Sequence, residues 1–356
     1  MSLSLAALLA LSTFTTPTRE LSLDQATPEV SRTYRVRQKV TLSEIPSGTA
    51  DVRWWIAIPS DDRAQEVLDM EITSAPGPWS VQREAEHGNR FLFVQVASPT
   101  STQLEVELEF TLRRRPIRVD IDAEHIGALS AGDRVYFANE LRLDDPHMEV
   151  TPQVRAIADR VCGDTRNIAR EALQLLEYVA GNADHYSKDP TKPKCGVGDA
   201  LDCLANGGGC CTDLHSLFIA LARARGIPTR LQMGYRLLAK NEGKEVDPGY
   251  RCWPEYFVPG HGWVAADVVE ADAASGAEGR AWFTGLSERR LWLNEGRNFV
   301  LGPQQSTPRV NTMVIGHAEL DGRAARVLPD GERAAQLSRT IRFEELRPAS
   351  TAEAAK

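Results

Sequence analysis

The stretch from Gly207 to Arg230, GGGCCTDLHSLFIALARARGIPTR, constrains the fold of this chain more than any other. It opens with three glycines, and apolar residues then recur at the spacing of one buried helical face, at Leu214, Leu217, Phe218 and Leu221. Gly226 suits the left-handed residue that ends a helix, and Pro228 prevents the helix from resuming. The pattern therefore predicts a glycine-rich loop followed by an amphipathic helix.

Cys211 lies where this loop becomes the helix. A thiol at that place meets the free N–H groups and the positive end of the helix dipole, which lower the thiol pKa and favour the nucleophilic thiolate. We therefore expect Cys211 to be a site cysteine. Cys210 and Cys252 are expected to be packing residues, and Asp213 is expected to cap the helix or to shape the loop.

Composition and charge exclude several classes of function. The 356-residue chain has a net charge of −8, which argues against a nucleic-acid partner. Beyond the first residues there is no run of about 18 apolar residues, so we expect no membrane-spanning segment in the mature chain. None of the six cysteines forms a CxxC pair, and we expect neither a metal nor a cofactor. The sequence does not choose between a Cys195–Cys203 and a Cys203–Cys210 disulfide.

The N-terminus contains the apolar segment LSLAALLAL, which has the length of a signal-peptide core. No Lys or Arg precedes it, and no clean A-x-A cleavage site follows it. We therefore expect residues 1–29 to be a signal peptide or a disordered tail. A signal peptide would place the protein in the periplasm or outside the cell, and its absence would place it in the cytoplasm.

Period-two strand patterns, separated by turns that contain Pro and Gly, predict an antiparallel β-sandwich over residues 30–115. Residues 116–150 are expected to form a connector, and residues 151–280 an α+β core of helices followed by an antiparallel meander. Further strand signals over residues 281–346 are expected to extend the sheet. Residues 347–356 are expected to form a disordered tail.

Two segments resemble the motifs of the transglutaminase-like superfamily, in its bacterial branch. The first is the Gly207–Arg230 stretch, and the second is RCWPEYFVPGHGWVAADVVEAD, which begins at Arg251. The second motif of the family is usually His-x-Trp-x-Glu, then Pro-Gly-x-Gly-Trp, then Asp. The matching positions in this chain are Trp253, Glu255, Pro259, Gly260, Gly262, Trp263 and Asp267.

The resemblance implies a papain-like core, in which one helix packs on an antiparallel sheet, and an activity of thiol acyl transfer to or from peptides. It implies that Cys211 is the nucleophile and that Asp267 orients the catalytic histidine. However, Arg251 occupies the position of the family histidine. Arginine stays protonated and cannot act as a general base. General acid–base help is typically worth ~10²–10⁴ in rate, so we expect poor turnover.

The chain contains other histidines outside this position. His215 lies on the same helix face as Cys211, four residues further on, and is the candidate substitute base, although the resemblance favours a structural role for it. His261 lies in a turn, about 25–30 Å from position 251, and is rejected. His185 begins a polar loop and is expected to be solvated. We identified no second oxyanion donor beside the Cys211 N–H.

These residues leave three hypotheses. In the first, the protein is a divergent cysteine acyltransferase or peptidase that acts on a protein or peptide substrate. In the second, it is a catalytically impaired scaffold that binds peptides in the same cleft, where Arg251 and Asp267 form an ion pair or recognise a carboxylate. The third and weakest hypothesis is a thiol redox role through Cys203 or Cys210.

Overall fold

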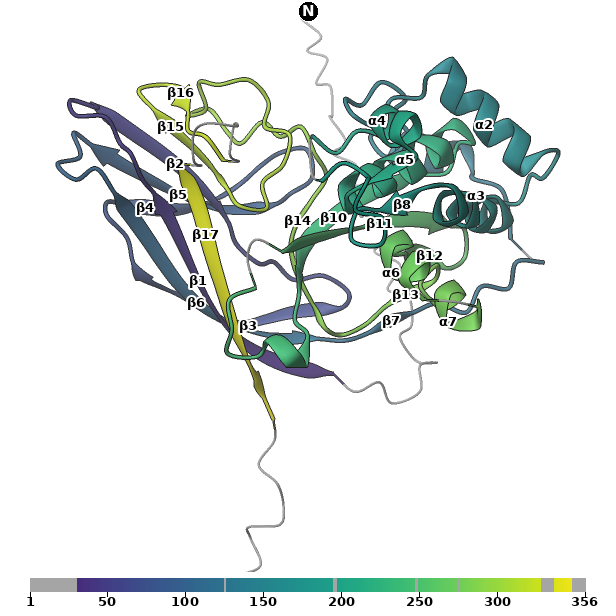
Figure 1. Cartoon of the computed structure of the whole chain (residues 1–356), viewed down its shortest axis with the longest axis horizontal. Coiled ribbons are helices and arrows are strands. Elements are labelled where there is room, and N and C mark those ends of the chain that lie inside the picture. Colours follow the sequence, from purple (N-terminus) through teal and green to yellow (C-terminus); the bar gives the residue numbers. More distant parts are fainter. Residues whose placement is uncertain are drawn as a thin grey trace, which may run out of the picture.

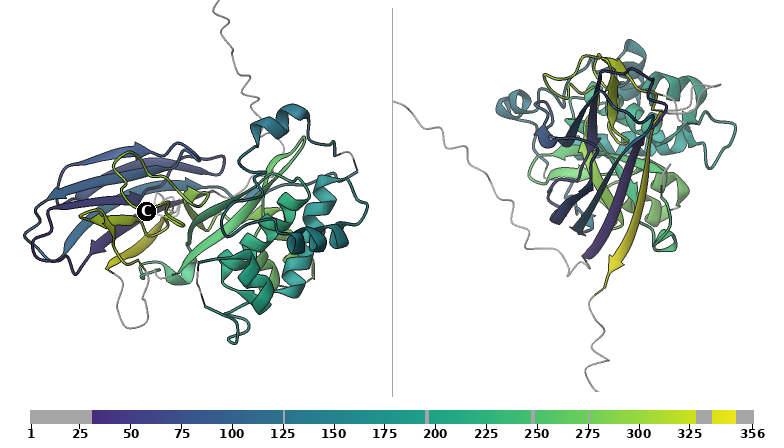
Figure 2. Two further views of the ribbon diagram at one scale, coloured as in Figure 1. Left: turned by 90° about the horizontal axis from the view of Figure 1, so that it is seen from above. Right: turned by 90° about the vertical axis from the view of Figure 1, so that its left-hand side faces the viewer.

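The computed structural model describes residues 31–124, 126–194, 197–246, 249–274, 276–327 and 336–347. These residues form a β-sandwich and an α+β core, which lie next to each other in Figure 1 and in the left view of Figure 2. The expected signal peptide or tail at residues 1–29 lies outside the described residues, and so do residues 348–356 of the expected C-terminal tail. No helix in the described ranges has the length and apolar character that crossing a membrane requires.

The first sheet of the sandwich has the antiparallel strand order β17-β1-β6-β3. Its strands are β1 (Arg32–Leu42), β3 (Gln65–Ser74), β6 (Leu104–Arg114) and β17 (Leu337–Leu346). In β1 and β6 a buried residue alternates with a more exposed one, as expected where only one face of a sheet packs on a core. The predicted period-two pattern is therefore present in these strands.

The second sheet has the order β16-β15-β2-β5-β4. Its strands are β2 (Asp51–Ala57), β4 (Trp79–Arg83), β5 (Arg90–Ala97), β15 (His317–Leu320) and β16 (Arg323–Ala324). The C-terminal strands β15, β16 and β17 thus belong to the sandwich, although the sequence led us to expect that residues 281–346 would extend the sheet of the core. Strand pairing between distant segments explains this difference, because a strand pattern does not identify its partner.

The sheet of the core has the antiparallel order β12-β11-β10-β14. Its strands are β10 (Thr229–Arg236), β11 (Tyr250–Val258), β12 (Gly262–Ala265) and β14 (Arg290–Glu295). In Figure 1 this sheet lies between the sandwich and the helices. Only β14 fulfils the expectation that the C-terminal region extends this sheet.

Helix α5 (Cys211–Ala224) packs on the helical side of this sheet, against β10 and β11. The helices α2 (Pro152–Cys162) and α3 (Ile168–Asn182) contact α5 as well, so that all fourteen residues of α5 are buried. The helix is therefore central, and not the half-exposed amphipathic helix that its apolar spacing predicts. It ends as predicted, because Gly226 has a positive φ of 72°.

Shorter elements complete the fold. They are β7 (Ile117–Arg118), α1 (Ala131–Tyr136), β8 (Asp184–His185), α4 (Ala200–Asn206), β9 (Gly208–Gly209), a 3₁₀ turn (Ala239–Asn241), α6 (Val268–Ala273), α7 (Gly276–Ala281) and β13 (Gly285–Leu286). Of these, β8, β9 and α6 flank the start of α5 and position the side chains described below.

The other face of the core sheet meets the sandwich. Trp253 packs there with Ala64 and Trp292 in a small apolar cluster. Glu255 is buried beside them and accepts hydrogen bonds from Arg230 at 2.6 Å and from Arg63 at 2.9 Å. These two residues of the second motif therefore stabilise the contact between the two parts of the molecule and lie on the side of the sheet away from α5.

Candidate functional site

The glycine-rich loop is held against strand β8. Gly208 and Gly209 pair in parallel with Asp184 and His185. A Cβ atom on Gly208 would lie 2.1 Å from the carbonyl oxygen of Asp184, so only glycine permits this approach. The loop consequently brings β8 close to the first turn of α5.

Cys210 is the N-cap of α5, and Cys211 is its first helical residue. The carboxylate of Asp213 accepts the Cys210 N–H at 2.8 Å and the Asp199 N–H at 2.9 Å. Asp213 therefore both caps the helix and shapes the loop, as the sequence predicts. The predicted place of Cys211 at the start of the helix is confirmed.

Cys211 is almost completely buried, with an exposure of 3%. A contact with Cys210 favours its thiolate, and so does the charge of Arg251. A contact with Cys252 and burial act in the opposite direction, and together they raise the pKa of Cys211 well above its ordinary value. The expected lowering of this pKa is thus reversed, because a helix dipole worth about 0.3–1 kcal/mol does not offset the loss of solvation.

His215 belongs to a chain of hydrogen bonds beneath Cys211. Its Nε2 accepts the Val268 N–H at 3.2 Å, which assigns the ring proton to Nδ1, and Nδ1 donates to Cys252 Sγ at 3.2 Å. The thiol of Cys252 in turn donates to Thr212 Oγ1 at 3.6 Å. Both nitrogens of this fully buried ring are therefore occupied, and neither offers a lone pair to Cys211.

Asp267 is the N-cap of α6 and is buried. Its Oδ1 accepts the N–H groups of Val269 and Glu270, and its Oδ2 accepts Arg290 Nη2 at 2.7 Å. Burial alone would raise the pKa of Asp267, but the charge of Arg290 and a contact with His215 hold that pKa well below its usual range. Asp267 is therefore an ionised partner of Arg290, and the ion pair that we expected between Asp267 and Arg251 does not form.

Arg251 is half-buried near the start of β11, opposite Gly234 of β10. Its Nη1 donates to the carbonyl oxygen of Tyr250 at 3.0 Å, and its Nε is buried without a partner. Among the residues that the structure describes, no carboxylate lies within ion-pair distance of its guanidinium. The charge of Arg251 acts on both Cys211 and His185 and lowers the pKa of each.

His185 is the site residue that sequence reasoning missed. It was expected to be solvated, but it is 3% exposed, because β8 is held between β9 and α6. Its Nδ1 accepts the Ser187 N–H at 3.2 Å and lies 2.7 Å from Ser187 Oγ, which assigns the ring proton to Nε2. Burial and the charge of Arg251 lower the pKa of His185 to about 4. At neutral pH it is therefore a neutral hydrogen-bond donor.

This burial predicts an acid-sensitive stability. The pKa of His185 rises from about 4 in the folded protein to 6.5 on unfolding, so the unfolded chain binds more protons between these values, and the free energy of unfolding falls as the pH is lowered from 6.5 to 4. His185 should account for ~2–3 kcal/mol of this decrease in the free energy of unfolding. Urea unfolding at pH 4.5 and at pH 7 should show the decrease in the wild type, and the decrease should be absent in His185→Gln.

Ser187→Ala is the matched control for His185→Gln. It removes the hydroxyl contact to Nδ1 but keeps the imidazole and the backbone N–H bond, so the pH dependence should persist. An equal pH dependence in His185→Gln and in the wild type would contradict the assignment of this effect to His185.

None of the cysteines that the structure describes forms a disulfide, and all of them are buried. They are Cys162, Cys203, Cys210, Cys211 and Cys252. The Cys203–Cys210 disulfide is therefore not formed. The alternative Cys195–Cys203 pairing lies outside the described residues, because Cys195 is not among them.

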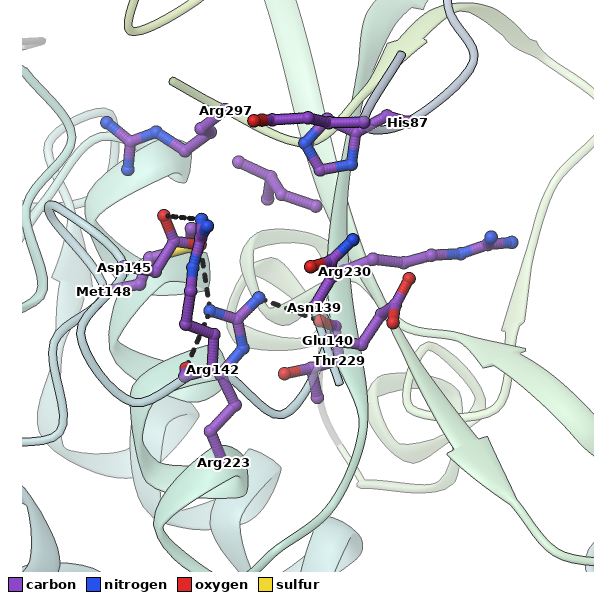
Figure 3. Close-up of a pocket in the computed structure, with 13 residues that line it drawn as sticks. His87, Asn139, Glu140, Arg142, Asp145, Met148, Arg223, Thr229, Arg230 and Arg297 are labelled. Atoms are coloured by element: carbon purple, nitrogen blue, oxygen red, sulfur yellow. Dashed lines mark hydrogen bonds and ion pairs between the residues drawn. The ribbon is translucent and has the colours of Figure 1, made fainter. Parts of the chain in front are cut away.

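A small cleft lies apart from the thiol site, between the sandwich and the core. Figure 3 shows Asp145 in it, bonded to Arg142 at 2.8 Å and to Arg223 at 2.9 Å. His87 of the sandwich faces this cleft from the other side. None of its lining residues is Cys211, His185 or Arg251, so the chemistry of the thiol does not take place in this cleft.

Comparison with known proteins supports the resemblance over the core. Residues 155–268 match the sequence model of the transglutaminase-like superfamily, and this range includes Cys211, Arg251 and Asp267. The chain is 28% identical over 207 residues to an uncharacterized protein of Haemophilus influenzae; the match covers 50% of this chain and 55% of that relative. The chain thus spans little more than half the length of this relative.

Among solved structures, a Cytophaga hutchinsonii protein described as a "putative cysteine protease" aligns with a TM-score of 0.58 and 14% identity. The alignment covers 90% of this chain and 93% of that one. The periplasmic domain of TgpA from Pseudomonas aeruginosa aligns with a TM-score of 0.31 and 17% identity, over 67% of this chain and 87% of that domain. The first likeness supports the fold, an N-terminal β-sandwich followed by a transglutaminase-like core; the second is too small to argue from.

Proposed function

We propose that this protein is a peptide-binding member of the transglutaminase-like group, in which Cys211 is retained but thiol acyl transfer is impaired. One observation carries the proposal: Arg251 stands where proton transfer needs a histidine, and neither nearby imidazole can replace it. His215 has both ring nitrogens occupied. His185 accepts at Nδ1 and carries its proton on Nε2.

The chemistry of acyl transfer supports this conclusion. The thiolate is the nucleophile, and a raised pKa leaves little of it at neutral pH. After the attack, the leaving amine needs a proton that Arg251 cannot supply at any physiological pH. Both halves of the reaction therefore lack their proton carrier, while the helix start and the thiol are in place.

The alternative is a divergent enzyme that acts on glutamine amides or peptides. One observation favours it: a thiol, an imidazole and a carboxylate lie in a row in space. His215 Nδ1 is 3.2 Å from Cys252 Sγ, and His215 Nε2 is 3.6 Å from Asp267 Oδ1. In this alternative Cys252 would relay the proton of Cys211 to His215. This relay requires the ring proton of His215 to move from Nδ1 to Nε2. The Val268 N–H opposes that move, because it donates a hydrogen bond to Nε2.

The proposal is tested by turnover. A glutamine-containing peptide is incubated with the wild type and with Cys211→Ala, and both ammonia release and amine incorporation are followed, with peptide-bond hydrolysis as a third readout. We expect the two proteins to be equally inactive. Turnover in the wild type that disappears in Cys211→Ala would overturn the proposal and establish the divergent enzyme.

We also propose that the protein is exported from the cytoplasm. The apolar segment near the N-terminus supports a periplasmic or secreted protein whose partner is an extracytoplasmic protein or peptide. Buried thiols are compatible with that location, because burial protects them from oxidants.

A further inference from the structure

The edges of the β-sheets differ in how well they are covered. An edge strand carries outer N–H and C=O groups that lack a partner within the sheet, and such an edge can pair with another chain. In the first sheet, the loop after the 3₁₀ turn covers β17, where the Gly243 N–H donates to the Phe343 carbonyl oxygen at 3.0 Å. The Val246 N–H donates to the Ile341 carbonyl oxygen at the same distance. The other edge, β3, is protected because its register with β6 is interrupted twice.

The core sheet is capped at its edges by side chains of the sandwich. On β14, the side-chain amide of Gln65 accepts the Trp292 N–H and donates to the Trp292 carbonyl oxygen, both at 2.9 Å. The amide of Asn89 makes the same two bonds with the backbone of Glu295, both at 2.7 Å. On β12, which is only four residues long, Arg63 donates to a backbone carbonyl oxygen. Both edges of this sheet are therefore engaged within the molecule.

Strand β4 lacks such protection. It is the last strand of the second sheet (Figure 1), whose opposite edge, β16, is only two residues long. Its register with β5 is regular, and four of its five residues are exposed. Apart from the ladder with β5, no residue that the structure describes bonds the backbone of Trp79, Val81 or Arg83. This edge is therefore uncovered in the described part of the chain.

The pairing of β4 with β5 determines which backbone groups point outward. At the two ends of β4, the Gln95 N–H donates to the Pro78 carbonyl oxygen at 3.2 Å, and the Glu84 N–H donates to the Asn89 carbonyl oxygen at 3.0 Å. Bonded and non-bonded pairs alternate along an antiparallel ladder, so the even-numbered residues bond β5 and the odd-numbered residues point outward. The N–H that Pro78 lacks would face β5, so this proline does not block the outer edge.

The side chains of β4 extend a buried apolar surface to this edge. Trp79 and Val81 lie opposite Val94 and Leu92 of β5, which are both fully buried. Residues that lie opposite each other share one face of a sheet. Trp79 and Val81 nevertheless remain 51% and 41% exposed, because no further strand follows. Exposed apolar side chains beside unpaired backbone groups are typical of a surface that another strand covers.

We propose that β4 pairs with β4 of a second copy of this chain, antiparallel and about a two-fold axis at Val81. The strand is complementary to itself in this register: Val81 lies opposite Val81, Ser80 opposite Gln82, and Trp79 opposite Arg83. An aromatic ring then meets a cation twice in the dimer, and the outward N–H groups of each copy meet outward carbonyl oxygens of the other. This surface does not include Cys211, so the inference holds whether or not the thiol turns over a substrate.

The oligomeric state of the full chain tests this inference. One added strand pair makes a small interface, so we expect a reversible dimer with a Kd on the order of 10–100 µM. Sedimentation velocity from about 1 µM to about 500 µM should therefore show a change from monomer to dimer. A chain that stays monomeric over this whole range would overturn the inference.

Variants assign the dimer to β4 and to this register. Val81→Pro removes an outward N–H and keeps the bonds to β5, so it should weaken the dimer by at least about tenfold. Trp79→Lys sets a lysine against Arg83 and should weaken it similarly, whereas Trp79→Lys combined with Arg83→Glu restores an attractive pair and should recover most of the affinity. Tyr136→Lys is the matched control, because Tyr136 is an exposed aromatic residue outside β4. A dimer that Val81→Pro does not weaken would contradict the proposed pairing.

Hydrogen exchange of the wild type tests the pairing without a substitution. When it is read residue by residue by mass spectrometry, the amides of Trp79, Val81 and Arg83 should exchange at least about tenfold more slowly in the dimer than in the monomer. The amides of Ser80 and Gln82 already bond β5 and should change little. Outward amides that are equally protected at about 1 µM would show that another segment or a bound peptide covers β4. That result, or outward amides that stay unprotected in the dimer, would overturn the inference.

Discussion

Replacing Arg251 with histidine is expected to create hydrolysis of a glutamine peptide that depends on Cys211. The imidazole would stand at the position from which Arg251 now acts on the thiol. It would supply both the base and the acid that arginine lacks, and such help is worth ~10²–10⁴ in rate. The rate of ammonia release should therefore exceed that of the wild type by at least about 10²-fold.

Two variants make this result specific. Arg251→Gln removes the charge without adding a base and should stay inactive, and Arg251→His combined with Cys211→Ala should lose all that was gained. Should Arg251→His remain as inactive as Arg251→Gln, the missing base would not be what limits the site. The pairing of Asp267 with Arg290 would then be the next suspect, because it withholds the aspartate that should orient the new histidine.

Replacing Arg290 with methionine is expected to lower the free energy of unfolding by about 3–5 kcal/mol, the range for breaking a buried ion pair by removing one partner. Arg290 is 1% exposed, bonds Asp267 and lies over the rings of Trp253 and Trp282. Its removal leaves the Asp267 carboxylate buried without its cation. Urea unfolding at pH 7 measures the loss.

The double variant Arg290→Met, Asp267→Asn tests whether the pair is the cause. It removes both charges, so part of the lost stability should return relative to Arg290→Met alone. Arg289→Met, at the neighbouring and more exposed position, is the control and should cost far less. A loss below about 1 kcal/mol in Arg290→Met would show that the pair contributes no more than a surface ion pair does.

Local patterns predicted the parts of the site that depend on neighbouring residues. The start of α5 at Cys211 and its end at Gly226 follow from apolar spacing, glycine and proline. The role of Asp213 follows from its place three residues after the N-cap.

Contacts between distant segments were not predictable in this way. His185 is buried because β8 pairs with Gly208 and Gly209, and no local signal shows this pairing. Arg290 reaches Asp267 from another strand and takes the partner that we had assigned to Arg251. The raised pKa of Cys211 depends on Cys252, which becomes its neighbour only through the packing of α5 on β11.

The pH dependence of Cys211 alkylation tests most directly whether this thiol lacks a proton acceptor. The rate constant for iodoacetamide is measured at the Cys211 peptide from pH 5 to pH 11. We predict that the rate constant is low at neutral pH and continues to increase above pH 9.0, the ordinary pKa of a thiol, without reaching a plateau earlier. A plateau reached at or below about pH 7, as a thiolate–imidazolium pair produces, would contradict the account.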